Sequence, residues 1–415
     1  MALLPHTPHR PGNGTGAFLR RVFLFAAFAC LAPNLLSQTP SPPLRADITM
    51  FQLQFMAGEP VYVHFEITNT GKEPLQYATA NPYSEFCSGY HVDVSASGSA
   101  NFTCHTIVDS ECVGGVDILS PGATLRQNIL VNYQHNLSNP GDYRIHASRV
   151  FKYGSVGDPG LSTSAKQLKF EKNFSIQVYP GSRQSLQMIY QVYVSNLQSG
   201  DGEIQREAER VIASGAPPWL EDTIIGMLRR YTSREFALLG LKNLNSPRSR
   251  QELANIVQNT SEGTPESETA AAYLAQLGDK KYFPMLLQIA TKLPPSESRT
   301  YVLAAAQLGG DDALPFLQEL LNSSDTNARA TAILGLEKTG SRAAVPVLLA
   351  VLKDSNADLG HLALNSLAGL THRNAEVSND PPSDLYPSWG NWWAAQGHTA
   401  TIYRPEQCTA AQPLP

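Results

Sequence analysis

The chain has 415 residues, of which 42% are hydrophobic and 16% are charged, and its formal net charge is −5. This composition is typical of a folded globular protein of two or three domains and excludes a wholly disordered chain. A mildly acidic chain without a basic stripe binds nucleic acid poorly, so no nucleic-acid partner is expected.

The N-terminal residues 1–37 are predicted to be a signal peptide. Three arginines precede an apolar run that spans residues 22–36. An apolar run of this length after positive charges is typical of a secretory signal and is short for a membrane span. We therefore expect cleavage near Ser37, export to the periplasm or the medium, and no stable membrane span in the mature chain.

Residues 38–44 are a predicted Pro/Ser-rich linker, and a strand-forming pattern begins at residue 45 and continues to 181. Apolar and polar residues alternate over 61–67, which predicts a half-buried strand. Further strands are predicted at Ile48–Phe55, Leu75–Ala78, Tyr90–Ser95, Thr124–Tyr133, Asp142–Phe151 and Phe170–Val178. Short strands separated by Gly, Pro and Asn turns favour a β-sandwich for residues 45–181.

Two short motifs in this region resemble immunoglobulin-like sandwiches. The segment 140–145 resembles a tyrosine corner, in which Tyr143 ties the entry of a strand to the backbone. The segment 58–70 resembles bacterial Ig-like modules, including proteinase-inhibitor-type sandwiches. The resemblance implies an Ig-like domain and adds an alternative function, an exported protease inhibitor that acts through a loop of the sandwich.

Export permits disulfide bonds between cysteines. The five cysteines are Cys30, Cys87, Cys104, Cys112 and Cys408. Cys104 and Cys112 close a short loop and are the preferred pair, while the pairing of Cys87 and Cys408 stays open. Cys30 lies in a poor lipobox, and its lipidation also stays open. A metal-binding loop formed by Cys104, His105 and Cys112 is an alternative, although the paired CxxC spacing of a zinc site is missing.

The sequence contains no HExxH motif, Walker loop, Rossmann glycine fingerprint or GxSxG elbow. These motifs place nucleophiles, phosphates or metals in several large enzyme classes. We therefore expect neither an enzymatic activity nor a cofactor.

The second half of the chain repeats with a period of 31 residues. The period is marked by Gly278, Gly309 and Gly340, and by Pro284, Pro315 and Pro346. Apolar residues three and four apart predict one helix that ends at each glycine, and a second helix begins near each proline. A fixed period of this size predicts helical pairs that share a buried core with their neighbours, so residues 184–371 are expected to form an α-solenoid.

The repeats beginning at Gly278-Asp279, Gly310-Asp311 and Gly340-Ser341 resemble HEAT-like repeats, in the short variety found in phycobilisome lyases. The ending, Leu370-Thr371 followed by a tryptophan-bearing segment, resembles the close of HEAT-repeat proteins that bacteria export. The resemblance implies a solenoid and leaves the partner open, because such repeats bind many unrelated partners. Lyase activity is not implied, since no bilin-related motif accompanies the repeats.

Residues 372–404 are predicted to form a C-terminal cap. Trp389, Trp392 and Trp393 fall on one helical face and would cover the open end of the stack. A ligand-binding aromatic cluster is the competing interpretation. Residues 405–415 are expected to be a flexible tail.

The predicted fold is therefore multidomain, an all-β Ig-like sandwich followed by an all-α HEAT-like solenoid. The predicted function is non-enzymatic binding of a partner protein on a concave surface lined by the second helices of the repeats. Candidate contact residues on those helices are Gln288, Lys292, Glu319 and Lys353. The sequence names neither the partner nor the oligomeric state.

Overall fold

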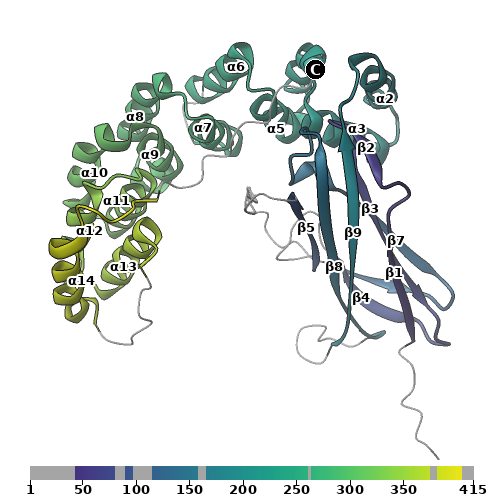
Figure 1. Cartoon of the computed structure of the whole chain (residues 1–415), viewed down its shortest axis with the longest axis horizontal. Coiled ribbons are helices and arrows are strands. Elements are labelled where there is room, and N and C mark those ends of the chain that lie inside the picture. Colours follow the sequence, from purple (N-terminus) through teal and green to yellow (C-terminus); the bar gives the residue numbers. More distant parts are fainter. Residues whose placement is uncertain are drawn as a thin grey trace, which may run out of the picture. The chain divides into compact units, whose positions relative to one another are not determined.

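The computed structural model describes residues 43–79, 89–96, 115–157, 165–259, 263–373 and 381–403. Strands occupy the chain up to Tyr179 and helices follow from Arg183 (Figure 1). The prediction of a strand-rich region followed by a helical region is confirmed. We call residues 43–179 the sheet region and residues 183–403 the helical region. The predicted signal peptide and all five cysteines lie outside the described residues.

The first sheet of the sheet region is antiparallel and contains β1 (Leu44–Thr49), β3 (Tyr62–Asn69) and β7 (Thr124–Leu130) in the order β1-β3-β7. Along β3, fully buried residues alternate with half-buried ones. This is the pattern that the alternation of apolar and polar residues predicts, because successive side chains of a strand point to opposite faces.

The second sheet has the order β2-β9-β8-β4-β6, and β5 also pairs with β8. Its strands are β2 (Gln54–Met56), β4 (Leu75–Thr79), β5 (Tyr90–Ala96), β6 (Gly115–Leu119), β8 (Gly141–Ser155) and β9 (Lys166–Tyr179). β2 runs parallel to β9, and the other pairs are antiparallel.

Buried side chains from both sheets form two apolar clusters between them, and the larger one contains Phe65, Tyr90, Ile129 and Ile145. Phe65 of β3 packs edge-on against Tyr90 of β5, with ring centroids 5.0 Å apart. Ile129 of β7 belongs to the same cluster as Ile145 of β8 and is almost fully buried, as is Ile145. The two sheets therefore face each other across a shared core.

The prediction of one strand over Ile48–Phe55 is wrong. The chain leaves β1 of the first sheet at Thr49 and enters β2 of the second sheet at Gln54. Alternation of side chains is the same in either sheet, so the local pattern does not show the change of partner. Edge strand β6 was also absent from the predicted strands, because four of its five residues are exposed and give no alternation.

The helical region consists of paired helices. Their bounds are α2 (Arg183–Asn196), α3 (Gly202–Gly215), α4 (Glu221–Met227), α5 (Arg234–Leu244), α6 (Pro247–Gln258), α7 (Pro265–Leu277), α8 (Phe283–Lys292), α9 (Pro295–Gly309), α10 (Leu314–Leu321), α11 (Thr326–Lys338), α12 (Ala344–Val351), α13 (Ala357–Thr371) and α14 (Pro382–Gln396). The first helices of the pairs, α3, α5, α7, α9, α11 and α13, form a row in which each packs against the next. We call this the first-helix row, and α6, α8, α10 and α12 the second-helix row.

The glycine signals act as predicted at Gly278 and Gly340, but in the repeat between them Gly309 stays helical and Gly310 takes the left-handed conformation instead. Gly278 ends α7 in the left-handed conformation, with φ of 72°, which glycine adopts without a steric cost. Asp279 then accepts a hydrogen bond from the backbone N–H of Lys281, and Ser341 accepts one from that of Ala343. In the middle repeat Asp311 caps no backbone N–H, and its carboxylate accepts a hydrogen bond from the hydroxyl of Ser341 instead.

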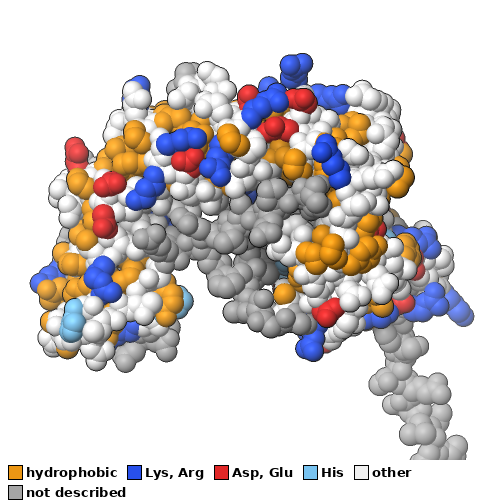
Figure 2. All heavy atoms as spheres, turned by 45° about the horizontal axis from the view of Figure 1, so that its top comes forward, with side chains coloured by type: hydrophobic (Ala, Val, Ile, Leu, Met, Phe, Trp, Pro, Cys, Tyr) orange, Lys and Arg blue, Asp and Glu red, His pale blue; other side chains and the backbone are white. Residues whose placement is uncertain are grey.

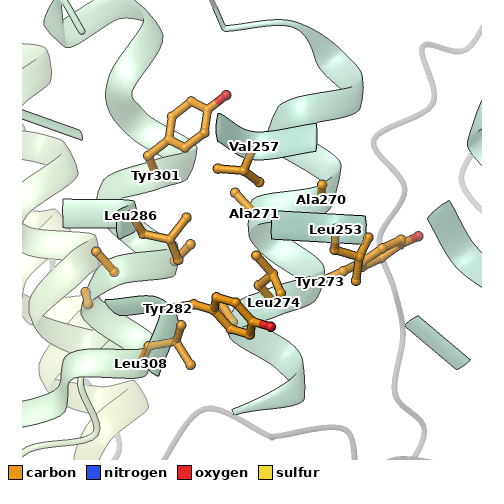
Figure 3. Packing of buried hydrophobic residues seen from close by; sticks show 14 of the residues in the cluster. Leu253, Val257, Ala270, Ala271, Tyr273, Leu274, Tyr282, Leu286, Tyr301 and Leu308 are labelled. Atoms are coloured by element: carbon orange, nitrogen blue, oxygen red, sulfur yellow. The ribbon is translucent and has the colours of Figure 1, made fainter. Parts of the chain in front are cut away.

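Neighbouring helical pairs share one core, as Figure 3 shows for α6 to α9. Leu253 of α6, Leu274 of α7 and Leu286 of α8 have no exposed surface, and Tyr301 and Leu308 of α9 are almost fully buried. Each fully buried leucine contributes about 1.5–3 kcal/mol relative to an exposed one. Since these residues come from different pairs, no pair buries its apolar face alone.

Two tyrosines join the sheet region to the first helices. The buried hydroxyl of Tyr190 in α2 donates a hydrogen bond to the carbonyl of Gly58, at 2.9 Å. The hydroxyl of Tyr62 in β3 donates to the carboxylate of Glu207 in α3. Burial raises the pKa of both hydroxyls, so they remain protonated donors. Leu130 of β7 is part of the helical core, which makes the junction apolar as well as hydrogen-bonded.

Candidate functional site

The four predicted contact residues lie on or beside the second-helix row and are exposed. Gln288 and Lys292 belong to α8, and Glu319 belongs to α10. Lys353 follows α12, and its ammonium nitrogen lies 3.6 Å from the ring centroid of Tyr386 in α14. The first three side chains are therefore presented to solvent, while Lys353 also packs against the C-terminal helix. Their role in binding stays a prediction.

Charged side chains of both signs are mixed over the face of the molecule shown in Figure 2. Ion pairs form between and within repeats: Arg250 of α6 contacts Asp279 of the next helical pair at 3.2 Å, whereas Arg329 of α11 pairs with Asp354, just after α12 of the same pair. These charges are thus engaged within the stack. A binding site is better sought where a charge has no such counterpart.

Aromatic and charged side chains gather where the first-helix row meets the sheet region. Tyr133, in the 3₁₀ turn Val131–Tyr133, donates a hydrogen bond of 3.3 Å to the carboxylate of Glu235 in α5. The guanidinium of Arg210 in α3 lies 6.0 Å from the ring centroid of Tyr133 and 5.6 Å from that of Phe236. Burial, followed by the charge of Glu235, raises the pKa of Tyr133.

Lys242 of α5 lies next to this group and differs from the other cations of the row. Its ammonium nitrogen is 5.0 Å from the ring centroid of Tyr273 in α7, a cation–π distance. Among the residues that the structure describes, no carboxylate lies within ion-pairing distance of it. Burial lowers the pKa of Lys242 to about 8, and burial followed by the charge of Glu235 raises the pKa of Tyr273 to about 12.

The amide of Gln276 completes this group of side chains. Gln276 follows Tyr273 by three residues on α7, so the two side chains are neighbours on the helix surface. Its side-chain oxygen is buried and accepts no hydrogen bond from the described part of the chain. Figure 3 shows that the ring of Tyr273 points away from Leu286, yet Tyr273 is only 6% exposed and belongs to the helical core. We call Lys242, Tyr273 and Gln276 the Lys242 site.

Alignment of the repeats shows that the Lys242 site is unusual. The four predicted contact residues were chosen by exposure on the second helices and not by this criterion. Tyr273 occupies the slot of Ala304 and Gly335 in the next two first helices, where side chains are small or absent. Matching Leu241 with Leu274, both without exposed surface, places Lys242 in the slot of Ala275 and Ala306, which Glu337 occupies in the following repeat. Departures from a repeat that coincide in space are expected where a function overrides packing.

At the C-terminal end, α14 packs against α12 and α13. Trp389 is 3% exposed and belongs to the helical core, whereas Trp392 and Trp393 are half-buried against it. The guanidinium of Arg373 lies 4.8 Å from the ring centroid of Trp389 and 4.9 Å from that of Trp392. Trp389 is thus occupied in packing.

Other kinds of site are not visible in the described residues. Within these ranges, no three His, Cys, Asp or Glu side chains group closely enough to hold a metal ion. The predicted disulfide pair Cys104 and Cys112, and the alternative metal loop, lie outside the described residues. No helix of the described part combines the length and the apolar character that a membrane span requires.

Comparison with known families identifies the repeats. The family described as HEAT repeats matches residues 283–368, from α8 into α13. The helical region therefore contains HEAT-like repeats, as predicted. None of the curated proteins matches the chain.

Similarity to solved structures is distant. An engineered protein from the Northeast Structural Genomics Consortium is 18% identical, with a TM-score of 0.20. The alignment covers 46% of this chain and 84% of the engineered protein. Escherichia coli alpha-2-macroglobulin, in its native conformation, is 13% identical, with a TM-score of 0.17. The alignment covers 85% of this chain and 26% of that protein.

Proposed function

We propose that the chain is an exported, non-enzymatic scaffold that binds a partner protein through its HEAT-like repeats. One observation carries this proposal. Within the second-helix row, the buried slot is leucine in three successive repeats, Leu286, Leu317 and Leu348, all with no exposed surface. Two residues further on, the exposed slot changes from Gln288 to Glu319 to Ala350. A constant core under a changing surface suits recognition of an irregular partner surface.

The sheet region is proposed to be an Ig-like domain that belongs to the same scaffold. Support comes from Tyr143 at the start of β8, whose hydroxyl donates a hydrogen bond of 2.9 Å to the carbonyl of Asn139. A tyrosine bonded to the backbone a few residues upstream is the tyrosine corner of such sandwiches. Export is proposed from the arginines and the apolar run of residues 1–37.

Affinity capture tests the proposed function. The mature chain is immobilised and exposed to periplasmic extract or culture medium of the source cells, and a captured protein is then purified and titrated against it. Replacing Glu319 by Lys is expected to weaken the affinity about tenfold, equivalent to about 1.4 kcal/mol. The control is Glu171→Lys, an exposed charge on β9 of the sheet region.

Two outcomes of this experiment are informative. An equal loss of affinity in both variants indicates a general charge effect and contradicts a site on the second-helix row. Failure of the mature chain to capture any protein, in either source, contradicts the scaffold proposal itself.

A further inference from the structure

We propose that the exposed face of α2 is an interface through which two copies of the chain associate about a two-fold axis. The exposed residues that form this face are Gln184, Gln187, Met188, Gln191, Val192 and Ser195. We call it the α2 face. The inference goes beyond the proposed function, because it involves none of the helices of the second-helix row.

The α2 face carries two large apolar side chains. α2 lies at one end of the helical region and packs on α3, with its own Leu186 and Tyr190 buried (Figure 1). On the α2 face, Met188 is 65% exposed and Val192, one turn further along the helix, is 59% exposed. Among the helices of the described part of the chain, no other exposes two large apolar side chains. An exposed apolar patch with a polar rim is typical of an interaction surface.

The α2 face also lacks charge. The one charged residue within Arg183–Asn196 is Arg183, whose guanidinium lies 5.5 Å from the ring centroid of Trp219. The solvent side of a surface helix usually carries charged residues. An uncharged exposed face offers no counter-charge to an acidic or basic partner, so its occupant is expected to be uncharged at the contact as well.

A second copy of the chain meets this requirement. In a two-fold interface the same patch meets itself, so any charge near the axis would face a like charge. A glutamine amide carries both donors and an acceptor and can therefore pair with the same residue type. The α2 face has three such amides beside its apolar residues. The chain has a net charge of −5, so two copies approach each other most easily where neither surface is charged.

The spacing along α2 fits helix-to-helix packing. Four residues of the face follow one another at intervals of four, three and four: Gln184, Met188, Gln191 and Ser195. These are the intervals at which one helix packs along another. The sequence of intervals is the same in both directions, so an antiparallel copy fits in register, with Met188 of each copy against Gln191 of the other. The antiparallel arrangement also places opposite ends of the two helix dipoles together.

The exposed apolar residues of the sheet region are less suited to meeting a second copy. Val116 and Ile118 lie on edge strand β6, with Asp117 between them. A charged residue on an edge strand hinders pairing with another chain. No such charge interrupts the α2 face.

Sedimentation velocity of the mature chain over a range of concentrations tests the proposal. A single pair of short helices is a small interface, so we expect reversible association with a dissociation constant of about 10–100 µM. A covalent dimer through a cysteine would persist at the lowest concentration, which distinguishes it from this association.

Val192→Glu is the first variant, because it brings like charges from the two copies into one interface. We expect it to weaken the association at least about tenfold. Glutamate favours a helix at least as well as valine, so α2 keeps its fold. The matched control is Val116→Glu: Val116 is 61% exposed, close to the 59% of Val192, and its replacement should change the dissociation constant by less than about twofold.

A charge swap at Met188 tests whether the face meets its own copy. Met188→Lys and Met188→Glu should each self-associate at least about tenfold more weakly than the unaltered chain. An equimolar mixture of the two variants should associate about tenfold more tightly than either variant alone, because an ammonium of one copy then lies near a carboxylate of the other.

Three results overturn the proposal. They are a chain that stays monomeric at millimolar concentration, a Val192→Glu variant that associates as tightly as the unaltered chain, and a mixture of the two Met188 variants that associates no more tightly than each alone. Association that is lost in Val116→Glu and kept in Val192→Glu would place the interface on β6.

This proposal and the scaffold function fail separately. A monomeric chain that still captures a partner protein refutes the α2 interface and leaves the scaffold function. A chain that dimerises through α2 and captures no protein keeps the interface while the scaffold function fails. If both hold, each copy brings its own second-helix row, and the dimer can bind a multivalent partner more tightly than one copy does.

Discussion

The sheet region and the helical region differ in how far apart in the sequence their packed segments lie. In the sheet region, β3 pairs with β1 before it and with β7 about 60 residues after it, so Phe65 lies opposite Gln127. In the helical region, each first helix packs on the next one along the chain. A core built from distant segments forms or fails as a unit, whereas a stack of repeats distributes its stability over neighbours. The destabilising effect of a core substitution should therefore spread through the whole sheet region. In the helical region, the effect of a substitution of equal size should stay near the altered repeat.

The largest effect is expected from Phe65→Ala in β3. Phe65 is 1% exposed, between the two sheets, and its ring contacts those of Tyr90 and Phe170. Loss of a buried phenylalanine costs about 3–5 kcal/mol. Hydrogen exchange followed by mass spectrometry should show lower protection in strands of both sheets, including β8 and β9. A loss confined to β3 and its immediate neighbours would contradict a single cooperative core.

Trp389→Ala in α14 is expected to lower local stability by about 3–5 kcal/mol, as much as Phe65→Ala. The effect should extend to fewer neighbouring elements. Trp389 is 3% exposed and packs only at the end of the stack. Exchange should accelerate in α13 and α14, while α7 and α9 keep their protection. Trp393→Ala, a half-buried ring on the same helix, is the control and should have the smaller effect. Equal loss of protection throughout the helical region would show that the repeats do not behave as a nearest-neighbour stack.

The difference in connectivity also explains how far the sequence could be interpreted. The helical pairs were predictable because Gly278, Pro284 and their counterparts lie within the segment that they organise, and the HEAT match over residues 283–368 confirms them. The end of β1 and the start of β2 depend on pairing with β3 and β9, which lie elsewhere in the chain. No pattern within Ile48–Phe55 carries that information.

The candidate site shows the same limit. Exposed slots such as Gln288 and Glu319 follow directly from helical periodicity. The Lys242 site requires the contact between α5 and α7, and its trace in the sequence is the departure of Tyr273 from the small residues of its slot, Ala304 and Gly335. That trace becomes meaningful only when the helices are known to be in contact.

Two glycines of the helical region provide a finer test of local packing. A methyl group on Gly309 would lie 2.6 Å from a ring carbon of Phe283, with two more ring atoms within 3.0 Å. A methyl group on Gly335 would lie 2.6 Å from Cδ2 of Leu317, the mobile end of a flexible side chain. Gly309→Ala should destabilise by about 1–3 kcal/mol. Gly335→Ala should cost less, because the leucine can rotate and alanine favours the helix by about 1 kcal/mol. Urea unfolding followed by tryptophan fluorescence reports on this region, since all four tryptophans lie in it. A larger destabilisation by Gly335→Ala than by Gly309→Ala would contradict the packing described.

The smallest effect is expected from two carboxylates of the helical region that form ion pairs. Burial acts to raise the pKa of Asp279, but hydrogen bonds from Lys281 and Arg250 outweigh it and hold the pKa below its usual 3.8; Asp354 is lowered in the same way by the Asn356 N–H and Arg329. A carboxyl whose folded pKa is depressed stabilises the fold fully above its unfolded pKa, and this contribution disappears as the pH falls through the lower, folded value.

The double replacement Asp279→Asn and Asp354→Asn should therefore lower the free energy of unfolding at pH 7 by up to about 1 kcal/mol for each pair. The same variant should flatten the loss of stability of the helical region below pH 4, because its two amides no longer take up protons on unfolding. Asp312→Asn, an exposed carboxyl of the same region, is the control and should leave both the stability and its pH dependence unchanged. Urea titrations from pH 3 to pH 7 measure both quantities. An unaltered slope in the double variant would show that neither ion pair stabilises the helical region, whose stability would then rest on the apolar core alone.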